Sequence, residues 1–282
     1  MFWEYIKAII YGIIEGITEW LPISSTGHLI LLEEALRLDI GASPALAAQF
    51  SAMFDVVIQL GAILAVLFIY TKELTPFGDR KKEVFSLWQK LILATVPAAI
   101  IGLGADLVCE KYFGISLDTL LFNPKTVASA LIVYGILFIL VEKLTARSDK
   151  DKDITHSSAL AIGFFQALAI IPGTSRSGAT ILGARILGIP REKAARFSFF
   201  AAVPVIAAAS LLKIYDFAKF TASSEETLSL QAYLILLIAA LSAFLLSLAA
   251  IRFLTDFVKK HTFIPFGIYR IALGIAVLIF IK

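Results

Sequence analysis

The sequence of 282 residues has little charge and almost no cysteine. Asp, Glu, Lys and Arg make up 17% of it, whereas an ordinary soluble domain is about a quarter charged. Apolar residues make up 59%, and phenylalanine alone occurs 22 times. The single cysteine, Cys109, excludes an internal disulfide and a cysteine metal cluster, and we interpret it as a buried apolar side chain. These deficits argue against a soluble protein and favour one embedded in a membrane.

Basic residues are too scattered for nucleic-acid binding. The formal net charge is +3, and no run of Lys and Arg with interleaved aromatic residues occurs, so nucleic acid is not an expected partner. A cleavable signal peptide is not expected either. The first residues lack a basic start, and Glu15 and Glu19 interrupt the apolar region that such a peptide needs.

Six apolar stretches have roughly the length of a membrane-spanning helix, which is about 20 residues. They are residues 52–71, 91–108, 125–143, 197–213, 230–252 and 263–281. Two further stretches, 2–35 and 159–189, are interrupted by Pro, Gly and hydroxyl residues at 22–27 and 172–178. Irregular backbone at membrane depth is tolerated only inside protein or beside a wet cavity. We therefore interpret each stretch as a re-entrant helix–loop–helix hairpin; two ordinary spans or a kinked helix are the alternatives.

Lysine and arginine in the linkers test this arrangement, because they gather on the cytoplasmic side of membrane helices. The linkers rich in them are 72–90, 143–158 (with Arg147 and Lys150), 190–196 and 252–262. The linkers that contain only one each are 36–51, 109–124 and 214–229. With six spans and two hairpins that do not cross, all the rich linkers fall on one side. Both termini are then outside, and the two hairpins enter from opposite sides.

The two hairpins also resemble each other at an offset of 151 positions. The matched positions are Gly12 with Gly163, Glu15 with Gln166, and residues 24–27 with residues 175–178. Similar hairpins of opposite entry are typical of an inverted-topology repeat, whose polar breaks meet near the midplane. We therefore predict an all-α integral membrane protein, with one polytopic domain over 1–282 and approximate repeats 1–150 and 151–282.

The first hairpin carries two carboxylates one helical turn apart. Glu15 and Glu19 point to one face of a helix. Ionised carboxylates in a membrane segment usually face a polar interior, and like charges at this spacing call for a proton or a cation. We expect a general base or a pair of ligands for a divalent cation, Mg²⁺ or Ca²⁺. Glutamates that are solvated at the outer headgroup level are the alternative.

The polar residues after Pro22 begin the second arm of this hairpin. Ser24 is a good N-cap, and Ser25 and His28 share a helix face because they lie three residues apart. A hydroxyl beside an imidazole is a pairing that activates serine as a nucleophile. The free N–H groups of a helix start, near Ser24 and Thr26, favour a phosphate. Capping by the hydroxyls and simple packing of His28 are the alternatives.

The second break supplies a cation and further hydroxyls. Arg176 lies far from any aqueous linker and carries a cationic fork that suits phosphate oxygens. Its structural alternative is an ion pair with Glu15 or Glu19. The candidate phosphate donors beside it are Thr174, Ser175 and Ser177.

Two more polar residues lie within apolar spans. Arg270 is a candidate second phosphate contact, or a partner for a carboxylate such as Asp106 or Asp55. Gln59 has an open role, functional or structural. Together with the two hairpin breaks, these groups predict one site near the midplane. Cations and helix starts suit an anion, carboxylates suit proton transfer or a metal, and the apolar bundle suits a lipid tail, so a lipid phosphate ester or anhydride fits all three.

Four segments make the chain similar to a known family. Residues 15–28 (Glu-Gly-Ile-Thr-Glu-Trp-Leu-Pro-Ile-Ser-Ser-Thr-Gly-His) resemble the first signature of the undecaprenyl-pyrophosphate phosphatase family of bacitracin-resistance proteins. Residues 172–180 (Pro-Gly-Thr-Ser-Arg-Ser-Gly-Ala-Thr) resemble its second signature. Residues 197–204 and 263–270 match the family pattern in order, so the resemblance covers nearly the whole chain. One departure, a longer segment at 38–51, has no function that the sequence indicates.

The resemblance implies an enzyme that hydrolyses undecaprenyl pyrophosphate to undecaprenyl phosphate, recycling the carrier lipid of cell-wall synthesis and giving bacitracin resistance. It implies functional positions for Ser25, His28, Glu15, Glu19 and Arg176. A divalent-cation requirement follows from it too. So does a location in the bacterial inner membrane, with the site open to the periplasm or cell exterior.

The expected mechanism is phosphoryl transfer through a serine. Ser25 attacks the terminal phosphorus, His28 or Glu19 takes its proton, and Arg176 and the helix starts hold the phosphates. Water then releases phosphate from the seryl intermediate. His28 as the nucleophile is the alternative.

Transport is the rival function, because inverted repeats with broken helices are typical of transporters. A polyprenyl-phosphate flippase or ion-coupled transporter could use Glu15 and Glu19 for proton coupling. It would not need a serine and a histidine on one helix face, which favours the enzyme. Movement of labelled lipid without phosphate release in reconstituted vesicles would identify a transporter. A structural scaffold would leave Arg176 unexplained, and the sequence leaves the oligomeric state open, a homo-oligomer included.

Overall fold

Helices form all the regular secondary structure of the described residues, which are 2–76, 80–145, 151–224 and 226–280 of a computed structural model. Five helices are long and apolar enough to span a membrane: α3 (Pro44–Ile69), α5 (Lys81–Phe113), α7 (Pro124–Thr145), α10 (Arg191–Ser224) and α11 (Leu230–Lys260). They coincide with the first five predicted spans, which confirms the all-α membrane fold. Helices α5 and α10 extend past both ends of their predicted stretches into polar residues, because hydropathy detects only the apolar part of a helix. Helix α3 instead begins eight residues earlier than predicted and ends two residues earlier.

The sixth predicted span forms a shorter helix. It is α12 (Ile264–Phe280), an apolar helix of 17 residues, at the lower limit of the length that spans a bilayer. Two helices of only four and five residues lie in linkers, α4 (Thr71–Leu74) and α6 (Leu117–Leu121). Arg147 and Lys150, which the loop-charge argument used, lie outside the described residues.

Both interrupted stretches fold as two short helical arms with a break between them. In the first hairpin α1 (Phe2–Thr18) is followed by α2 (Ser25–Leu36), and in the second α8 (His156–Ala167) and the 3₁₀ turn η2 (Leu168–Ile170) precede α9 (Arg176–Ile186). The second arms have 12 and 11 residues, which at about 1.5 Å per residue is too short to cross about 30 Å of hydrocarbon. Two ordinary spans are therefore excluded in each stretch, and the helix–break–helix shape is confirmed.

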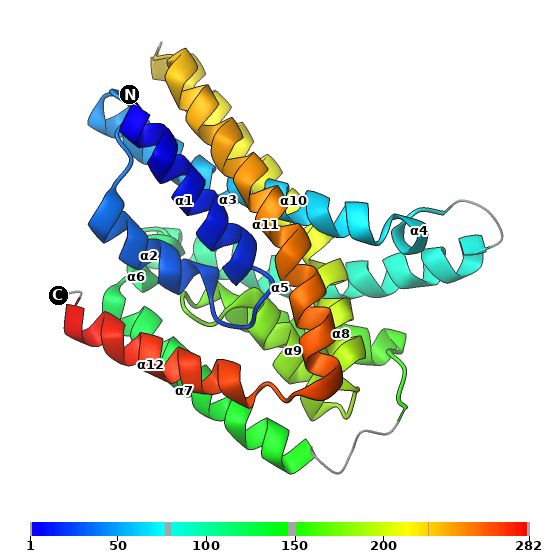
Figure 1. The fold of residues 1–282 in the computed structure, drawn as a ribbon. Coiled ribbons are helices and arrows are strands. Elements are labelled where there is room, and N and C mark those ends of the chain that lie inside the picture. The colour runs from blue at the N-terminus through cyan, green and yellow to red at the C-terminus, as the bar shows by residue number, and fades with distance from the viewer. Residues whose placement is uncertain (1, 77–79, 146–150, 225, 281–282) are drawn as a thin grey trace.

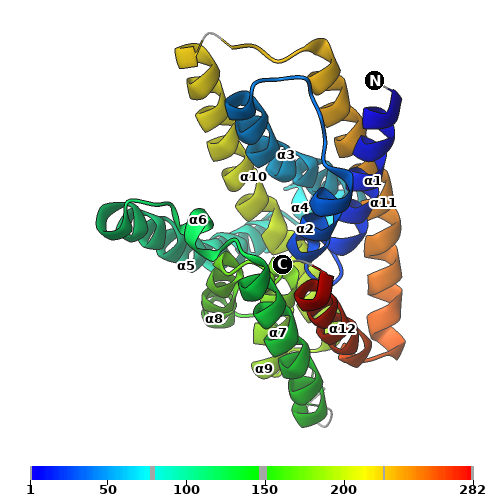
Figure 2. The ribbon, with the colours of Figure 1, turned by 90° about the vertical axis from the view of Figure 1, so that its left-hand side faces the viewer.

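The two halves of the chain interlock. The first arm of each hairpin packs on a long helix of the other half, α1 on α11 and α8 on α5 (Figure 1). Helix α12 packs along α7, and α3 contacts both α10 and α11 (Figure 2). The start of α1 and the end of α12 lie on one side of the molecule in the view of Figure 1 and α4 lies on the opposite side, while their sides of the membrane stay a prediction.

Close backbone contacts occur at Gly12 and Gly163, two positions that the predicted repeat matches to each other. A Cβ on Gly12 would lie 2.2 Å from the Ala239 carbonyl oxygen on α11, and a Cβ on the matched Gly163 would lie 2.6 Å from that of Ala94 on α5. Both glycines therefore allow a hairpin arm to touch the backbone of a helix from the other half. The opposite orientation of the two hairpins in a membrane stays a prediction.

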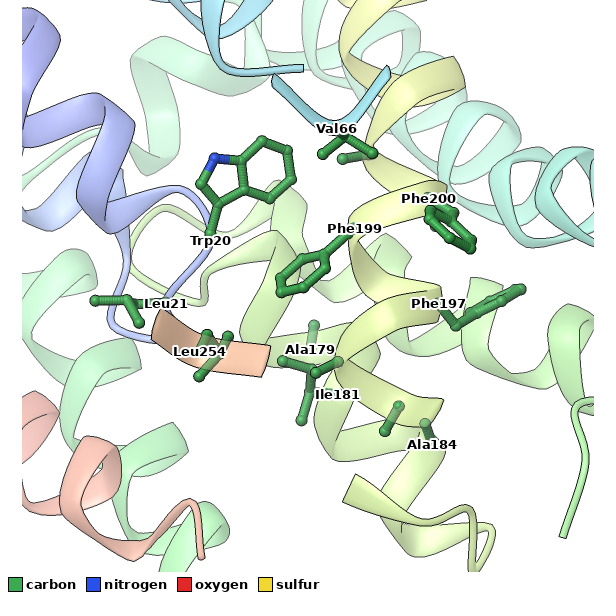
Figure 3. Close-up of a cluster of buried hydrophobic side chains, with 14 of the residues drawn as sticks. Trp20, Leu21, Val66, Ala179, Ile181, Ala184, Phe197, Phe199, Phe200 and Leu254 are labelled. Carbon is green, nitrogen blue, oxygen red and sulfur yellow. The ribbon is translucent and has the colours of Figure 1, made fainter. Parts of the chain in front are cut away.

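The main hydrophobic core lies beside the two breaks. Trp20 and Leu21 from the first break pack among Ala179 and Ile181 of α9 and Phe199 of α10 (Figure 3). The rings of Trp20 and Phe199 meet edge to face, with centroids 5.6 Å apart. Because this core contacts residues from both hairpins, it fixes their breaks relative to each other.

Candidate active site

The candidate site is centred on Glu19, which lies just after α1. One carboxylate oxygen accepts a hydrogen bond of 2.9 Å from the Ser25 hydroxyl at the start of α2. The other accepts one of 2.9 Å from Arg176 Nη2 at the start of α9. Arg176 Nη1 also donates to the Ser198 carbonyl oxygen at 2.7 Å. The two hairpins thus meet at a single carboxylate, and the anticipated ion pair of Arg176 is formed with Glu19.

Ser25 and Arg176 each follow a turn of the same geometry, one turn in each hairpin. Ser24 and Ser175 precede them, and each has a left-handed backbone, with φ of 74° and 70°. Each caps the helix that follows, its side chain accepting from the N–H three residues on, at 3.3 Å from Gly27 and 3.1 Å from Gly178. Left-handed geometry costs an L-residue roughly 1–2 kcal/mol, so both turns must be held by their surroundings. Ser24 as N-cap is confirmed.

The predicted pairing of Ser25 with His28 is wrong. His28 Nδ1 lies 2.7 Å from the Ser24 carbonyl oxygen, and Nε2 lies 2.7 Å from the hydroxyl of Tyr269 on α12. The spacing of three residues puts Ser25 and His28 on one helix face. The rotamer of His28, however, directs Nδ1 of its ring to the N-cap residue Ser24 and Nε2 to Tyr269 on α12. The Ser25 hydroxyl faces Glu19 instead.

Arg270 contacts neither of the two carboxylates suggested from the sequence. Its side chain is fully buried, with Nη1 donating to the Pro22 carbonyl at 3.2 Å and Nη2 donating to the carbonyls of Gly173 and Thr174 at 2.8 and 2.9 Å. Asp106 instead accepts from the Leu117 N–H at 2.8 Å. Arg270 thus acts as a clamp: it donates hydrogen bonds to both hairpin breaks and joins them. The carbonyl oxygens that it binds lie in the breaks, where no helical N–H group is available to them. Arg270 Nε is buried and has no hydrogen-bond partner among the described residues, so the predicted phosphate contact of Arg270 stays a prediction.

The other predicted hydroxyls lie around this clamp. Thr174 is buried in the second break. Ser175 acts as the N-cap, and Ser177 Oγ lies 3.2 Å from Ser175 Oγ and donates to the Leu21 carbonyl oxygen at 3.3 Å. Ser177 therefore connects the second hairpin to the first.

Glu15 is a second carboxylate of the first hairpin, one helical turn before Glu19. It is completely buried, and neither carboxylate oxygen has a hydrogen-bond partner among the described residues. Two guanidinium nitrogens, Arg176 Nε and Arg270 Nε, are likewise buried and have no hydrogen-bond partner among the described residues. Unsatisfied buried polar groups are rare in native proteins, which makes Glu15 and these two arginines candidates for contact with a bound ligand.

A cavity of about 520 Å³ begins beside Thr26. Apolar side chains of α2 and α3, such as Leu29 and Phe54, line it together with charged and amide groups. The polar lining includes Glu33, Arg37, Asp55, Gln59 and Lys213. Residues 38–51, which had no function from the sequence, contribute several lining side chains. The cavity thus joins apolar and polar surface, and among the predicted phosphate-site residues it is lined by Thr26.

A second buried ion-pair network fixes the far end of α9. Glu142 of α7 accepts from Arg185 Nε at 3.0 Å and from Arg191 Nε at 2.7 Å. Arg185 also donates to the Ile189 carbonyl and to Thr145 Oγ1, at 2.8 and 3.0 Å. This network holds the helix that starts with Arg176 against α7 and α10.

The sequence interpretation missed three groups, namely Tyr269, Ser198 and this Glu142 network. Tyr269 and Ser198 do lie in the segments 263–270 and 197–204, which match the family pattern, so a signal for them existed. Their partners, His28 and Arg176, are not close in sequence, and no local pattern connects them.

Fold and site together define an integral membrane protein of the all-α class, with a buried serine–carboxylate–guanidinium centre where two helix breaks meet. The family described as "Bacitracin resistance protein BacA" matches residues 8–276, and this chain belongs to that family. It is similar to proteins named undecaprenyl-diphosphatase from Acetivibrio thermocellus, with 49% identity over 98% of this chain and 97% of the relative. Similar relatives of the same name occur in Enterococcus faecalis, with 48% identity over 95% and 94%, and in Streptococcus mutans, with 49% over 99% and 97%.

The clamp role of Arg270 predicts a loss of stability on conservative replacement. A lysine ammonium cannot reach three carbonyls at once, so Arg270→Lys should lower the free energy of unfolding by about 3 kcal/mol, the contribution of one or two charge-assisted hydrogen bonds. Thermal unfolding in detergent would measure it. Arg252→Lys, on an exposed position of α11, is the matched control. Equal unfolding midpoints for the two variants would contradict the clamp.

Proposed function

We propose that this chain hydrolyses undecaprenyl pyrophosphate to undecaprenyl phosphate and inorganic phosphate. The observation that carries the proposal is the chain of contacts from Ser25 through Glu19 to Arg176, each link 2.9 Å long. It places a hydroxyl, a proton acceptor and a cationic donor together at a helix start. The names of the relatives agree with this chemistry.

Ser25 is the proposed nucleophile and Glu19 the base. The Ser25 oxygen attacks the terminal phosphorus while its proton passes to Glu19, with which it already shares a hydrogen bond. The bond between that phosphorus and the bridging oxygen breaks, and the electron pair leaves with undecaprenyl phosphate. Water then hydrolyses the seryl phosphate and restores the hydroxyl.

Arg176 stabilises the charge on the transferring group. In the structure it is held on Glu19, and its Nε is buried without a partner. Both features suit a guanidinium that exchanges part of its carboxylate contact for phosphate oxygens when the substrate is bound. Catalysis of phosphoryl transfer rests mainly on such positioning and charge stabilisation, which a dry apolar surrounding strengthens.

Phosphate release by purified protein tests the proposal. Wild type should release inorganic phosphate from undecaprenyl pyrophosphate. Ser25→Ala should lower the rate at least about a thousandfold, because it removes the nucleophile, and Arg176→Ala about a hundredfold or more. The controls are Ser157→Ala and Arg252→Ala, both at exposed positions. Full turnover by Ser25→Ala would refute the assignment, whereas phosphoserine trapped at Ser25 would support it.

We also propose that Glu15 contributes to a divalent-cation site. The described residues contain no cluster of three or more His, Cys, Asp or Glu that could hold a metal by itself. Mg²⁺, however, often binds through one or two carboxylates plus substrate phosphates and water. Glu15 fits that mode because both of its oxygens are buried and have no hydrogen-bond partner in the described part of the chain, and Glu19 lies one turn further along. A bound cation would neutralise charge on the pyrophosphate.

Binding of methylenediphosphonate, a pyrophosphate analogue that cannot be cleaved, tests this cation site without turnover. Mg²⁺ or Ca²⁺ should tighten its binding to wild type, and Glu15→Gln should reduce that effect by about tenfold or more, as loss of a metal contact does. Calorimetry on the detergent-solubilised protein would measure both. An equal cation effect in wild type and Glu15→Gln would refute the role of Glu15.

We place the protein in the bacterial inner membrane, with the site open to the cell exterior. The cavity beside Thr26 is lined by residues of the charge-poor linkers, among them Arg37, Ile40 and Phe122. Charge-poor linkers are the expected external ones. This location supports entry of the pyrophosphate from outside while its tail stays in the bilayer.

Cysteine labelling tests this orientation. In a Cys109→Ser background, Arg37→Cys should react with a membrane-impermeant maleimide on spheroplasts. Lys260→Cys, at the end of α11 in a charge-rich linker, should react only after the membrane is opened. Both positions are exposed, so access alone separates them. The reverse labelling pattern would invert the proposed orientation.

A further inference from the structure

His28 has both of its ring nitrogens engaged. The Ser24 carbonyl oxygen, 2.7 Å from Nδ1, can only accept, so Nδ1 must carry the proton that it donates. In the neutral ring Nε2 is then the acceptor, and the hydroxyl of Tyr269, 2.7 Å away, donates to it. The two rings lie nearly parallel, 6° apart with centroids separated by 5.6 Å. The contacts thus define one tautomer and one orientation of the imidazole.

This arrangement removes the imidazole from proton transfer at Ser25. The one lone pair that could accept a proton points to α12, whereas the Ser25 hydroxyl donates to Glu19. A general base must lie within hydrogen-bond reach of the proton it takes. Glu19 meets that condition, and Nε2 of His28 is occupied by Tyr269.

What His28 does hold is the strained residue before Ser25. Ser24 has its backbone in the left-handed region at φ 74°, and the bond from Nδ1 fixes its carbonyl. The residue after Tyr269, Arg270, donates to the Pro22 carbonyl on the other side of the same turn at 3.2 Å. Helix α12 therefore grips the turn at two points, directly through Arg270 and indirectly through Tyr269 and His28.

The second hairpin provides an internal comparison. Its left-handed Ser175 has a carbonyl that accepts the ordinary helical bond from the Ala179 N–H at 2.8 Å. Ala179 is the repeat equivalent of His28, at the offset of 151. An imidazole is thus found at this position only in the hairpin that presents the serine hydroxyl, and not in the one that presents Arg176.

We propose that His28 and Tyr269 are positioning residues, which hold the Ser24 turn so that the Ser25 hydroxyl faces Glu19 and the substrate phosphorus. This inference rests on the proposed function for its effect on rate. Its structural part concerns the hydrogen bond from Nδ1 and the tautomer that Tyr269 selects. Tyr269 comes from the other end of the chain, so folding of the last helix completes the active turn.

Two amide replacements separate positioning from base catalysis. Asparagine places an N–H₂ group near the position of Nδ1, whereas glutamine places one near the position of Nε2. Positioning predicts that His28→Asn keeps the phosphate-release rate within about tenfold of wild type. His28→Gln should lose about a hundredfold, as a misplaced reacting group does. Tyr269→Phe should lose about three- to tenfold, the equivalent of one hydrogen bond.

Base catalysis by His28 predicts a different pattern. Neither amide can accept the proton, so His28→Asn and His28→Gln would both lose about a hundredfold or more. That result, with both variants showing the unfolding midpoint of wild type, would overturn the proposal. If His28→Asn does not fold, the test rests on Tyr269→Phe. A phosphate-release rate equal to that of wild type in this variant would overturn the positioning role of Tyr269.

The tautomer gives a readout that does not depend on activity. Protein labelled with ¹⁵N-histidine contains three histidines, and the resonances lost in His28→Asn identify those of His28. We expect a neutral ring with the proton on Nδ1, and a shift of the Nε2 resonance in Tyr269→Phe. A ring protonated on Nε2 would overturn the inference. Absence of phosphate release by wild type would refute the proposed function while this spectrum still decides the tautomer.

Discussion

The carboxylate of Glu19 is the group on which the arrangement of the site depends, because it binds a residue from each half of the chain. Its two oxygens accept hydrogen bonds, one from Ser25 of the first hairpin and one from Arg176 of the second. Ser25 and Arg176 occupy equivalent positions in the two repeats, each following a left-handed serine cap. A buried charge is costly unless it is paired, so neither hairpin would be stable in this position without the other. One hairpin thus contributes the hydroxyl and the carboxylate of this centre, and the other contributes the guanidinium.

The breaks that create the site also create a problem for the fold. Carbonyl groups freed at a break within an apolar bundle find neither water nor a helical partner. Arg270 donates hydrogen bonds to three of these carbonyls, those of Pro22, Gly173 and Thr174. Ser177 of the second hairpin donates to the Leu21 carbonyl of the first break. The same donors that satisfy the backbone fix the two helix starts in place. Arg270 of α12 makes three of these four hydrogen bonds, so α12 contributes both to the stability of the breaks and to the position of the two helix starts.

Much of this could be predicted from the sequence, and the failures have a common cause. Apolar stretches located the long helices, and Pro-Gly-hydroxyl clusters located both breaks. Ser24 was predicted as an N-cap because capping depends on only three residues of backbone. The Ser25–His28 pair was wrong, since spacing along a helix gives the face and not the rotamer. Arg270 was assigned to phosphate or to a carboxylate, because nothing in its own span reveals that it faces the carbonyls of two distant turns.

The sequence by itself determined the membrane class, the helical segments, the caps and the set of residues able to handle a phosphate. These follow from hydropathy, backbone conformation and side-chain chemistry, which act over a few residues. Only the tertiary structure decided which of those residues meet: Glu19 with Arg176, 157 positions apart, and His28 with Tyr269, 241 apart. Partners at such separation depend on how the two halves pack. A hydrogen bond requires its donor and acceptor to come within about 3 Å, a distance that sequence spacing does not encode.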